Sequence, residues 1–244
     1  MQLTAYSSPS PENERTIVMI PARDEAAALA AVIRGVRNAL PEADILVMDD
    51  HSEDDTARIA REQGALLLRL PIHVGIGAAV QAGLQFAHRR GYRRALRCDG
   101  DGQHPAETLR ALLDPLQADA ADVVTGSRYL QQGGFVASPW RRLGSYWLAT
   151  EIGLLTGQHV TDPTSGLSAF NERAIALFAE EYPPDYPEPE AIVALRRAGL
   201  RLREVPAKMR ARQGGSSSIT TLLAAYYMLK VSLAVLVMAL RRRP

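Results

Sequence analysis

The sequence contains one cysteine, Cys98, in a chain of 244 residues. An internal disulfide is therefore excluded, and the composition suits a reducing compartment. Cys98 is expected to be a small buried residue. The formal net charge is only +1, which gives no general attraction for nucleic acid, so any charged ligand must be bound by a local cluster. The 47% hydrophobic and 23% charged content is that of one globular domain.

Residues 1–15 lack the charged and then apolar pattern of a signal peptide. This polar, proline-containing stretch is expected to be a flexible leader on a cytosolic catalytic body. Glycine is missing from residues 22–31, which follow the first predicted strand. A nucleotide-sugar pyrophosphorylase or a dinucleotide-binding protein needs a glycine-rich loop at that place. The sequence therefore disfavours both classes.

Short β-branched and apolar runs alternate with amphipathic segments from residue 16 onward. We predict strands at residues 16–20, 45–48, 67–70, 95–98 and 122–125, and helices at residues 29–40, 56–61, 78–89, 107–116 and 191–198. Strands and helices that alternate at this spacing predict an α/β fold with a mostly parallel sheet flanked by helices. In such sheets, ligands bind beyond the carboxyl ends of the strands.

Two aspartates, Asp99 and Asp101, follow the fourth predicted strand and are separated by one glycine. Both carboxylates can turn toward one hard cation, Mg²⁺ or Mn²⁺, which takes oxygen ligands and keeps substrate phosphates in its shell. Gln103 can add a neutral oxygen or orient a metal-bound water. An EF-hand loop is excluded, because His104 and Arg110 occupy the positions of its glycine and glutamate. Acidic residues beside glycine are also common in simple turns, so the motif alone leaves both interpretations open.

Polar or glycine-containing segments also follow the first three predicted strands, at residues 21–25, 49–50 and 73–77. Because the carboxyl ends of parallel strands meet at one edge of the sheet, a single ligand could contact all four strand ends.

Six motifs are found in a fixed order along the chain. They are residues 17–25, 49–56, 75–79, 99–105, 126–129 and 162–166. Together they resemble the family 2 glycosyltransferases of the GT-A fold, and within them the dolichyl- and polyprenyl-phosphate sugar synthases. The likeness covers roughly residues 16–215. It implies inverting transfer of a sugar from a nucleotide-diphosphate-sugar donor to a polyprenyl phosphate, at the cytoplasmic face of the membrane.

The resemblance also implies a role for individual residues in donor binding. The implied donor-binding residues are Pro21, Ala22, Glu25, Asp50, Gly77 and Asp99, and the implied metal ligands are Asp99, Asp101 and Gln103. Asp101 is the implied catalytic residue of this set. The cation, Mg²⁺ or Mn²⁺, would offset negative charge on the departing nucleoside diphosphate. Glu25 and Asp50 have a second interpretation, as helix caps or solvated loop residues.

The acceptor side is expected to come from the second half of the domain. By resemblance, the acceptor phosphate would be held by Arg128, Arg141, Arg142 and Ser145. The chain departs from close relatives at residues 165–168, where an expected arginine is absent. Glu188 lies where hydroxyl-accepting family members place a general base, and it is a second catalytic candidate. Glu188 could equally be a solvated residue in a rigid turn.

The chain ends with an apolar run at residues 222–240, broken only by Lys230 and Ser232, and then Arg241 to Arg243. Its length is about enough to span a bilayer, but spanning would place the terminal arginines outside, against the positive-inside tendency. We expect a helix that lies in the membrane interface or contacts a small membrane-protein partner. A core helix or the contact of a homo-oligomer is the alternative.

These observations give a division of the chain and a leading function. Residues 1–15 form the leader, 16–125 the donor half, 126–215 the acceptor half and 216–244 the membrane-associating tail. The leading function is a metal-dependent glycosyltransferase. Two alternatives remain open: transfer to a hydroxyl of a lipid-linked glycan in cell-surface polysaccharide biosynthesis, and a non-catalytic nucleotide-sugar-binding subunit.

Overall fold

The computed structural model describes residues 15–103, 105–130, 139–208 and 221–241. The strands are β1 (Thr16–Ala22), β2 (Asp44–Asp49), β3 (Leu66–Arg69), β4 (Arg94–Arg97), β5 (Val123–Ser127), β6 (Ser168–Asn171) and β7 (Leu202–Pro206). The helices are α1 (Ala26–Ala39), α2 (Thr56–Glu62), α3 (Ile76–Arg89), α4 (Glu107–Gln117), α5 (Pro139–Thr156), α6 (Glu172–Glu180), α7 (Pro187–Arg197) and α8 (Thr221–Leu240). The five predicted strands and the five predicted helices are all present, with small differences at their ends.

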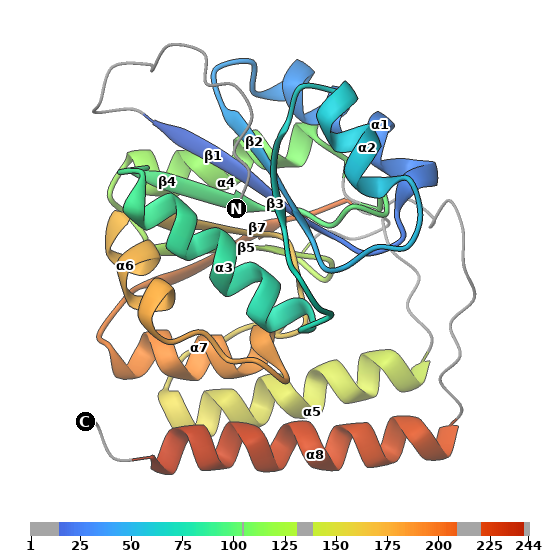
Figure 1. The fold of residues 1–244 in the computed structure, drawn as a ribbon. Coiled ribbons are helices and arrows are strands. Elements are labelled where there is room, and N and C mark those ends of the chain that lie inside the picture. The colour runs from blue at the N-terminus through green and yellow to red at the C-terminus, as the bar shows by residue number, and fades with distance from the viewer. Residues whose placement is uncertain (1–14, 104, 131–138, 209–220, 242–244) are drawn as a thin grey trace.

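The strands form one seven-stranded sheet in the order β3-β2-β1-β4-β6-β5-β7 (Figure 1). Every pairing is parallel except those of β6, which runs antiparallel to both β4 and β5. The prediction of a mostly parallel α/β sheet flanked by helices is therefore confirmed. The sequence analysis missed β6, β7, α5 and α6.

Alternate side chains of each central strand enter different cores, because successive residues point to opposite faces of a sheet. On β1, Ile17 and Met19 belong to the core beneath α3, α6 and α7, whereas Val18 and Ile20 belong to the core beneath α1 and α4. All four side chains are fully buried. Burial of each contributes about 1.5–3 kcal/mol, so the two cores hold β1 rigidly in the centre of the sheet.

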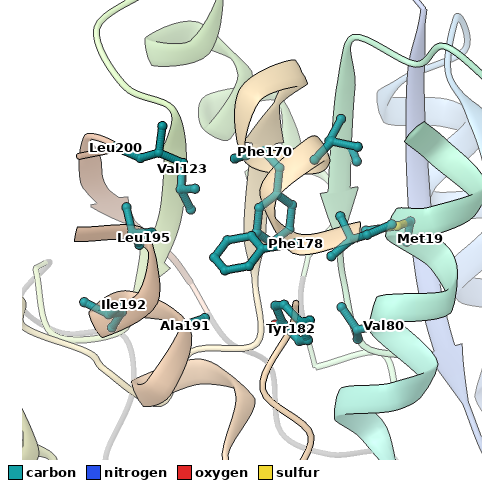
Figure 2. Packing of buried hydrophobic residues seen from close by; sticks show 14 of the residues in the cluster. Met19, Val80, Val123, Phe170, Phe178, Tyr182, Ala191, Ile192, Leu195 and Leu200 are labelled. Carbon is teal, nitrogen blue, oxygen red and sulfur yellow. The ribbon is translucent and has the colours of Figure 1, made fainter. Parts of the chain in front are cut away.

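Aromatic contacts join α6 to the sheet. Phe178 makes edge-to-face contacts with Phe170, at 5.9 Å between ring centroids, and with Tyr182, at 5.2 Å. Figure 2 shows these rings beside Met19 and Val80 in the same cluster. Edge-to-face packing of this kind adds roughly 0.5–1.5 kcal/mol per pair to the area term. The loop that follows α6 is thereby fixed close to the carboxyl end of β4.

Helices α5 and α8 form a further layer on one side of the molecule (Figure 1). They run side by side in the same direction, and Trp147 Nε1 of α5 donates to Ser232 Oγ of α8 at 3.0 Å. The inward side of α8 is part of the core, where Val231 and Val235 are fully buried. Arg197 of α7 donates to backbone carbonyls of the last turn of α8 and of the residue after it. α8 is thus packed against the body from Val231 to its carboxyl end.

Both ends of the chain are only partly described, and residues 104, 131–138 and 209–215 within the predicted domain also lie outside the described part. The predicted leader lies outside the described residues apart from Arg15, and residues 216–220 and 242–244 of the predicted tail also lie outside them. Within the described part of the chain, no helix combines the length and the apolar character needed to cross a bilayer. The membrane-associating role of the tail and the proposed domain boundaries stay predictions.

Candidate functional site

A cleft of about 280 Å³ lies at the carboxyl ends of β1, β2 and β4. Six residues predicted from the sequence line it together, namely Pro21, Ala22, Glu25, Asp50, Asp99 and Asp101. Arg23, His73 and the first turn of α3 complete the wall. The structure therefore brings most of the predicted donor and metal residues to one place.

The cleft suits a divalent cation. Asp99 and Asp101 line the same space, and Mg²⁺ is commonly bound by only one or two carboxylates together with substrate phosphates. The backbone N–H of Gln103 donates to Asp101 Oδ1 at 3.0 Å, which fixes the second carboxylate. The side chain of Gln103 is not among the described residues that line the cleft. The described residues contain no group of three or more metal-ligating side chains, so phosphate oxygens would have to complete the shell.

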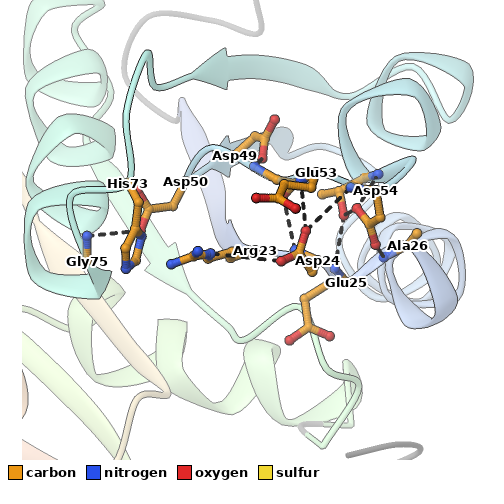
Figure 3. Close-up of polar contacts among 12 residues, drawn as sticks. Arg23, Asp24, Glu25, Ala26, Asp49, Asp50, Glu53, Asp54, His73 and Gly75 are labelled. Carbon is orange, nitrogen blue, oxygen red and sulfur yellow. Dashed lines mark hydrogen bonds and ion pairs between the residues drawn. The ribbon is translucent and has the colours of Figure 1, made fainter.

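Asp50 organises the loop between β3 and α3. Its carboxylate accepts hydrogen bonds from the backbone N–H groups of Val74 at 2.8 Å and Gly75 at 3.0 Å, and lies 2.7 Å from Nδ1 of His73 (Figure 3). Gly75 has φ of +86°, a conformation that other residues rarely adopt. Asp50 thus shapes the wall of the cleft as well as lining it. Direct contact with the donor stays a prediction.

The turn after β1 is held by side chains from the loop after β2. Asp24 adopts φ of +54° and accepts from the backbone N–H of Glu53 at 2.8 Å. Ser52 Oγ accepts from Asp24 N at 3.0 Å, and Thr56 Oγ1 accepts from Glu25 N at 2.9 Å. In Figure 3 the carboxylate of Glu25 points away from this turn. The network therefore fixes the backbone of Glu25 and presents its side chain at the cleft.

Gly77 has a packing requirement of its own. A Cβ atom there would lie 2.4 Å from the carbonyl oxygen of Pro184 and 2.5 Å from that of Pro183. No side chain fits against two backbone carbonyls at these distances. Gly77 thus allows α3 to pack against the segment that leads into α7, and its predicted contact with the donor is not tested.

Arg128 is engaged in a buried ion pair. Its Nε and Nη2 each lie 2.6 Å from an oxygen of Asp162, and Nη2 also donates to Thr164 Oγ1 at 2.7 Å. Burial lowers the pKa of Arg128, but the hydrogen bonds and charge of Asp162 outweigh burial and leave the pKa raised. Arg128 therefore carries its positive charge next to a buried carboxylate.

A second cavity, of about 600 Å³, lies beside α5. Arg142 and Ser145 line it, together with Tyr129, Tyr146 and His159. The Ser145 and Tyr129 hydroxyls are buried and have no hydrogen-bond partner in the described part of the chain, and Ser145 is only 6% exposed. Buried polar atoms are seldom left unpaired, so these two hydroxyls indicate a place for a polar ligand.

The other two predicted acceptor residues behave differently. Arg128 is not among the described residues that line the second cavity. Arg141 belongs to α5, but its side chain lies outside the described part of the structure. The structure thus brings Arg142 and Ser145 together and assigns Arg128 a separate partner.

Glu188, at the start of α7, lies behind Asp99. Its Oε1 is 2.8 Å from Nη2 of Arg97, and the same nitrogen is 3.7 Å from Asp99 Oδ1. Cys98, which lies between Arg97 and Asp99 in the sequence, is a small buried residue, as predicted, in the core beneath α1 and α4, and burial raises the pKa of its thiol well above the usual range. The predicted role of Glu188 as a general base is not tested by this arrangement.

The sequence model of Glycosyl transferase family 2 matches residues 17–178. This chain belongs to that family. Among relatives of this glycosyltransferase, a polyprenol monophosphomannose synthase of Mycolicibacterium smegmatis is 38% identical over 66% of this chain and 63% of the relative. An undecaprenyl-phosphate mannosyltransferase of Micrococcus luteus is 32% identical over 84% of this chain and 88% of the relative. The chain thus spans somewhat less than two thirds of the first relative.

Solved structures support the fold of this glycosyltransferase. Glucosyl-3-phosphoglycerate synthase from Mycobacterium tuberculosis, in complex with Mn²⁺, UDP and glucosyl-3-phosphoglycerate, superposes with a TM-score of 0.68. The two chains are 22% identical, and the alignment covers 97% of this chain and 86% of the other. The resemblance to the GT-A fold and to family 2 that the sequence suggested is confirmed.

Sequence reasoning missed several residues at these sites. Arg23 and His73 lie within the strand-end segments that were singled out, yet neither was assigned a role. Tyr129 directly follows Arg128 and could have been found with it. Arg97 gave no usable signal, because a basic residue at the end of a short strand is ordinarily solvated.

Proposed function

We propose that this family 2 glycosyltransferase moves a sugar from a nucleotide-diphosphate-sugar donor to a polyprenyl phosphate, with inversion at the anomeric carbon. The observation that carries the proposal is the pair of cavities. One holds the carboxylates of Asp99 and Asp101, and the other holds Arg142 with the unpaired hydroxyls of Ser145 and Tyr129. The first suits a metal-bound diphosphate, and the second suits an anionic acceptor. Both relatives described above are named as polyprenyl-type mannosyltransferases.

Asp99 and Asp101 would hold Mg²⁺ or Mn²⁺. When bound, the cation supplies charge stabilisation to the oxygens of the departing nucleoside diphosphate. The structural relative described above was crystallised with Mn²⁺ and UDP, which supports this cofactor class. Asp50 and the turn at Glu25 would contribute the rest of the donor site, since both line the same cleft.

A phosphate acceptor needs little help from a general base, because it is already an anionic nucleophile at neutral pH. It does need donors that orient it. The Arg142 guanidinium stays charged and donates in a fork, and the Ser145 hydroxyl has no competing partner among the residues that the structure describes. Glu188 is not required as a base in this reaction, and its carboxylate is paired with Arg97.

We predict that Ser145→Ala and Arg142→Gln will raise KM for undecaprenyl phosphate roughly tenfold to hundredfold, with KM for the nucleotide sugar nearly unchanged. A hydrogen bond to a charged group contributes about 1.5–3 kcal/mol. Loss of a contact with one substrate mainly raises KM for that substrate. The measurement is transfer from labelled nucleotide sugars, first screened as a panel. Arg58→Gln, on the exposed face of α2, is the matched control.

Two results of that assay would contradict the proposal. Transfer to a lipid-linked glycan hydroxyl, lost in Glu188→Gln and normal in Arg142→Gln, would establish a hydroxyl acceptor. Binding of nucleotide sugar without turnover on any acceptor would establish a non-catalytic subunit.

We further propose that α5 and α8 together lie in the cytoplasmic interface of the membrane. Both present large apolar side chains to solvent: Trp140, Leu143, Tyr146, Trp147 and Leu154 on α5, and Leu229, Leu233, Leu236, Val237 and Leu240 on α8. An exposed apolar surface of this extent marks an interaction site. Tryptophan and tyrosine favour membrane interfaces, and the sequence places arginines at 241–243, which favour anionic head groups.

The triple variant Leu229→Gln, Leu233→Gln and Leu240→Gln should lose most binding to anionic liposomes. Each leucine side chain that becomes buried in lipid contributes about 1.5–3 kcal/mol to membrane binding. In the protein itself these three side chains are exposed, so the fold should persist. Cosedimentation with phosphatidylglycerol vesicles measures the effect, and Ile72→Gln, an exposed residue between β3 and α3, is the control. High salt should weaken wild-type binding only in part, because salt screens charge but not apolar contact.

The competing occupants of this surface predict other results. If wild-type protein ignores vesicles but elutes as a dimer that the triple variant dissociates, the surface is an oligomer contact and the membrane proposal is wrong. If wild-type protein neither binds vesicles nor forms a dimer, a membrane-protein partner is the remaining candidate for this surface.

A further inference from the structure

Arg97 is a buried cation directly behind the predicted metal ligands. It is the last residue of β4, and its side chain is 4% exposed. Nη2 lies 2.8 Å from Glu188 Oε1 and 3.7 Å from Asp99 Oδ1. A charge removed from water is tolerated only when it is paired. One guanidinium is therefore shared between a residue of α7 and a carboxylate that faces the donor cleft.

Glu188, Asp99 and the backbone of Gly166 closely surround this group. A Cβ atom on Gly166 would lie 3.0 and 3.1 Å from the two carboxylate oxygens of Asp99 and 3.2 Å from Nη2 of Arg97. The backbone at Gly166 is thus packed against both partners. The Tyr182 hydroxyl also contacts Arg97, and burial raises the pKa of this hydroxyl to about 12, so the tyrosine is neutral. The guanidinium is held between a neutral hydroxyl, a glycine backbone and two carboxylates.

Resting on the donor site proposed above, we propose that Arg97 and Glu188 are positioning residues for Asp99. Arg97 orients the Asp99 carboxylate toward the cleft. Glu188 draws the guanidinium to itself, as the shorter distance shows, and so prevents Arg97 from closing a full ion pair with Asp99. A divalent cation at Asp99 would consequently meet weaker competition from the Arg97 guanidinium. Glu188 acts through Arg97 and does not touch the substrate.

This arrangement predicts an unusual pattern among variants. In Glu188→Gln the guanidinium loses its closest anion and moves onto Asp99, where it competes with the cation. In the double variant Arg97→Met with Glu188→Gln the competitor is gone, although Asp99 is less well oriented. Metal binding should therefore be weaker in Glu188→Gln than in the double variant. If the two substitutions acted independently, their effects would add, and the double variant would bind the metal most weakly of the set.

The test is Mn²⁺ binding, followed by the electron paramagnetic resonance signal of free Mn²⁺ in the presence of UDP and, separately, GDP. We expect Glu188→Gln to raise the apparent Kd for Mn²⁺ about tenfold and the double variant to recover a substantial part of the loss. Glu190→Gln is the matched control, because Glu190 lies on the same helix and is buried, but accepts a hydrogen bond from the backbone N–H of Tyr186. Melting without metal identifies any variant that fails to fold.

The outcomes separate this inference from the proposed function. If wild-type protein binds no Mn²⁺ with either nucleotide, the metal site itself is wrong and the inference fails with it. If wild-type protein binds Mn²⁺ and Glu188→Gln binds it equally well, only the positioning role is overturned. Glu188→Gln that keeps Mn²⁺ binding but loses transfer would identify Glu188 as the general base.

Discussion

Asp101→Asn should lower the rate of glycosyl transfer by at least about 100-fold and remove metal-dependent donor binding, while the fold remains intact. Asp101 lines the cleft with Asp99, and its carboxylate is fixed by the backbone of Gln103. The amide is nearly the same size but carries no charge to hold a cation. A bound metal contributes several kcal/mol to charge stabilisation of the leaving diphosphate, and about 1.4 kcal/mol corresponds to a factor of ten in rate.

The measurements are turnover with Mg²⁺ or Mn²⁺, nucleotide binding with and without metal, and thermal unfolding. Asp114→Asn, an exposed position on α4, the helix that follows the motif, is the control and should behave as wild type. Full activity in Asp101→Asn, together with full activity in the presence of a chelator, would show that this cleft uses no metal.

Arg128→Ala should destabilise the protein by about 3–5 kcal/mol, because it leaves Asp162 as a buried charge without its guanidinium. The side chain of Asp162 is fully buried and accepts two hydrogen bonds from the Arg128 side chain and one from its backbone. For a chain of this size the loss corresponds to a fall in Tm of roughly 6–20 °C. Differential scanning calorimetry on purified protein measures the change.

The double variant Arg128→Ala with Asp162→Ala should recover part of the loss, since no buried carboxylate then remains unpaired. Arg58→Ala, which breaks only exposed ion pairs on α2, should change stability by at most about 1 kcal/mol. One result would instead support the acceptor-binding role that the sequence suggested for Arg128. If Arg128→Ala melts like wild type and only KM for the lipid phosphate rises, the arginine binds the acceptor.

The parallel part of the sheet could be predicted from the sequence because its determinants are local. The apolar run of β1 and the periodic apolar residues of α1 can each be recognised from a short stretch of sequence. Asp99 and Asp101 directly follow a strand. β6 was missed for the opposite reason. It has four residues, and it lies between β4 and β5 because both of them pair with it in antiparallel fashion. That order is set by tertiary pairing, which a local pattern does not encode.

The same distinction separates the two sides of the site. The residues of the donor cleft come from successive strand ends, so the parallel topology alone brings them together. The environments of Arg97 and Arg128 depend on Glu188 and Asp162, which are distant in sequence. A formal charge in the sequence does not show whether its partner will be a ligand, water or a buried carboxylate. Sequence reasoning therefore located Arg128 and Glu188 without finding what they contact, and it missed Arg97.

The two-sided packing of α8 has a consequence for how the enzyme would exchange between membrane and cytosol. Val231 and Val235 fill the core, while Leu229 and Leu233 of the same turns face outward. Departure from the bilayer would then have to move the whole molecule as one body, with the donor cleft unchanged. Under the proposed membrane attachment, a detached pool would still bind nucleotide sugar but meet no lipid acceptor, so that membrane partitioning, rather than chemistry, would set the fraction of enzyme at work.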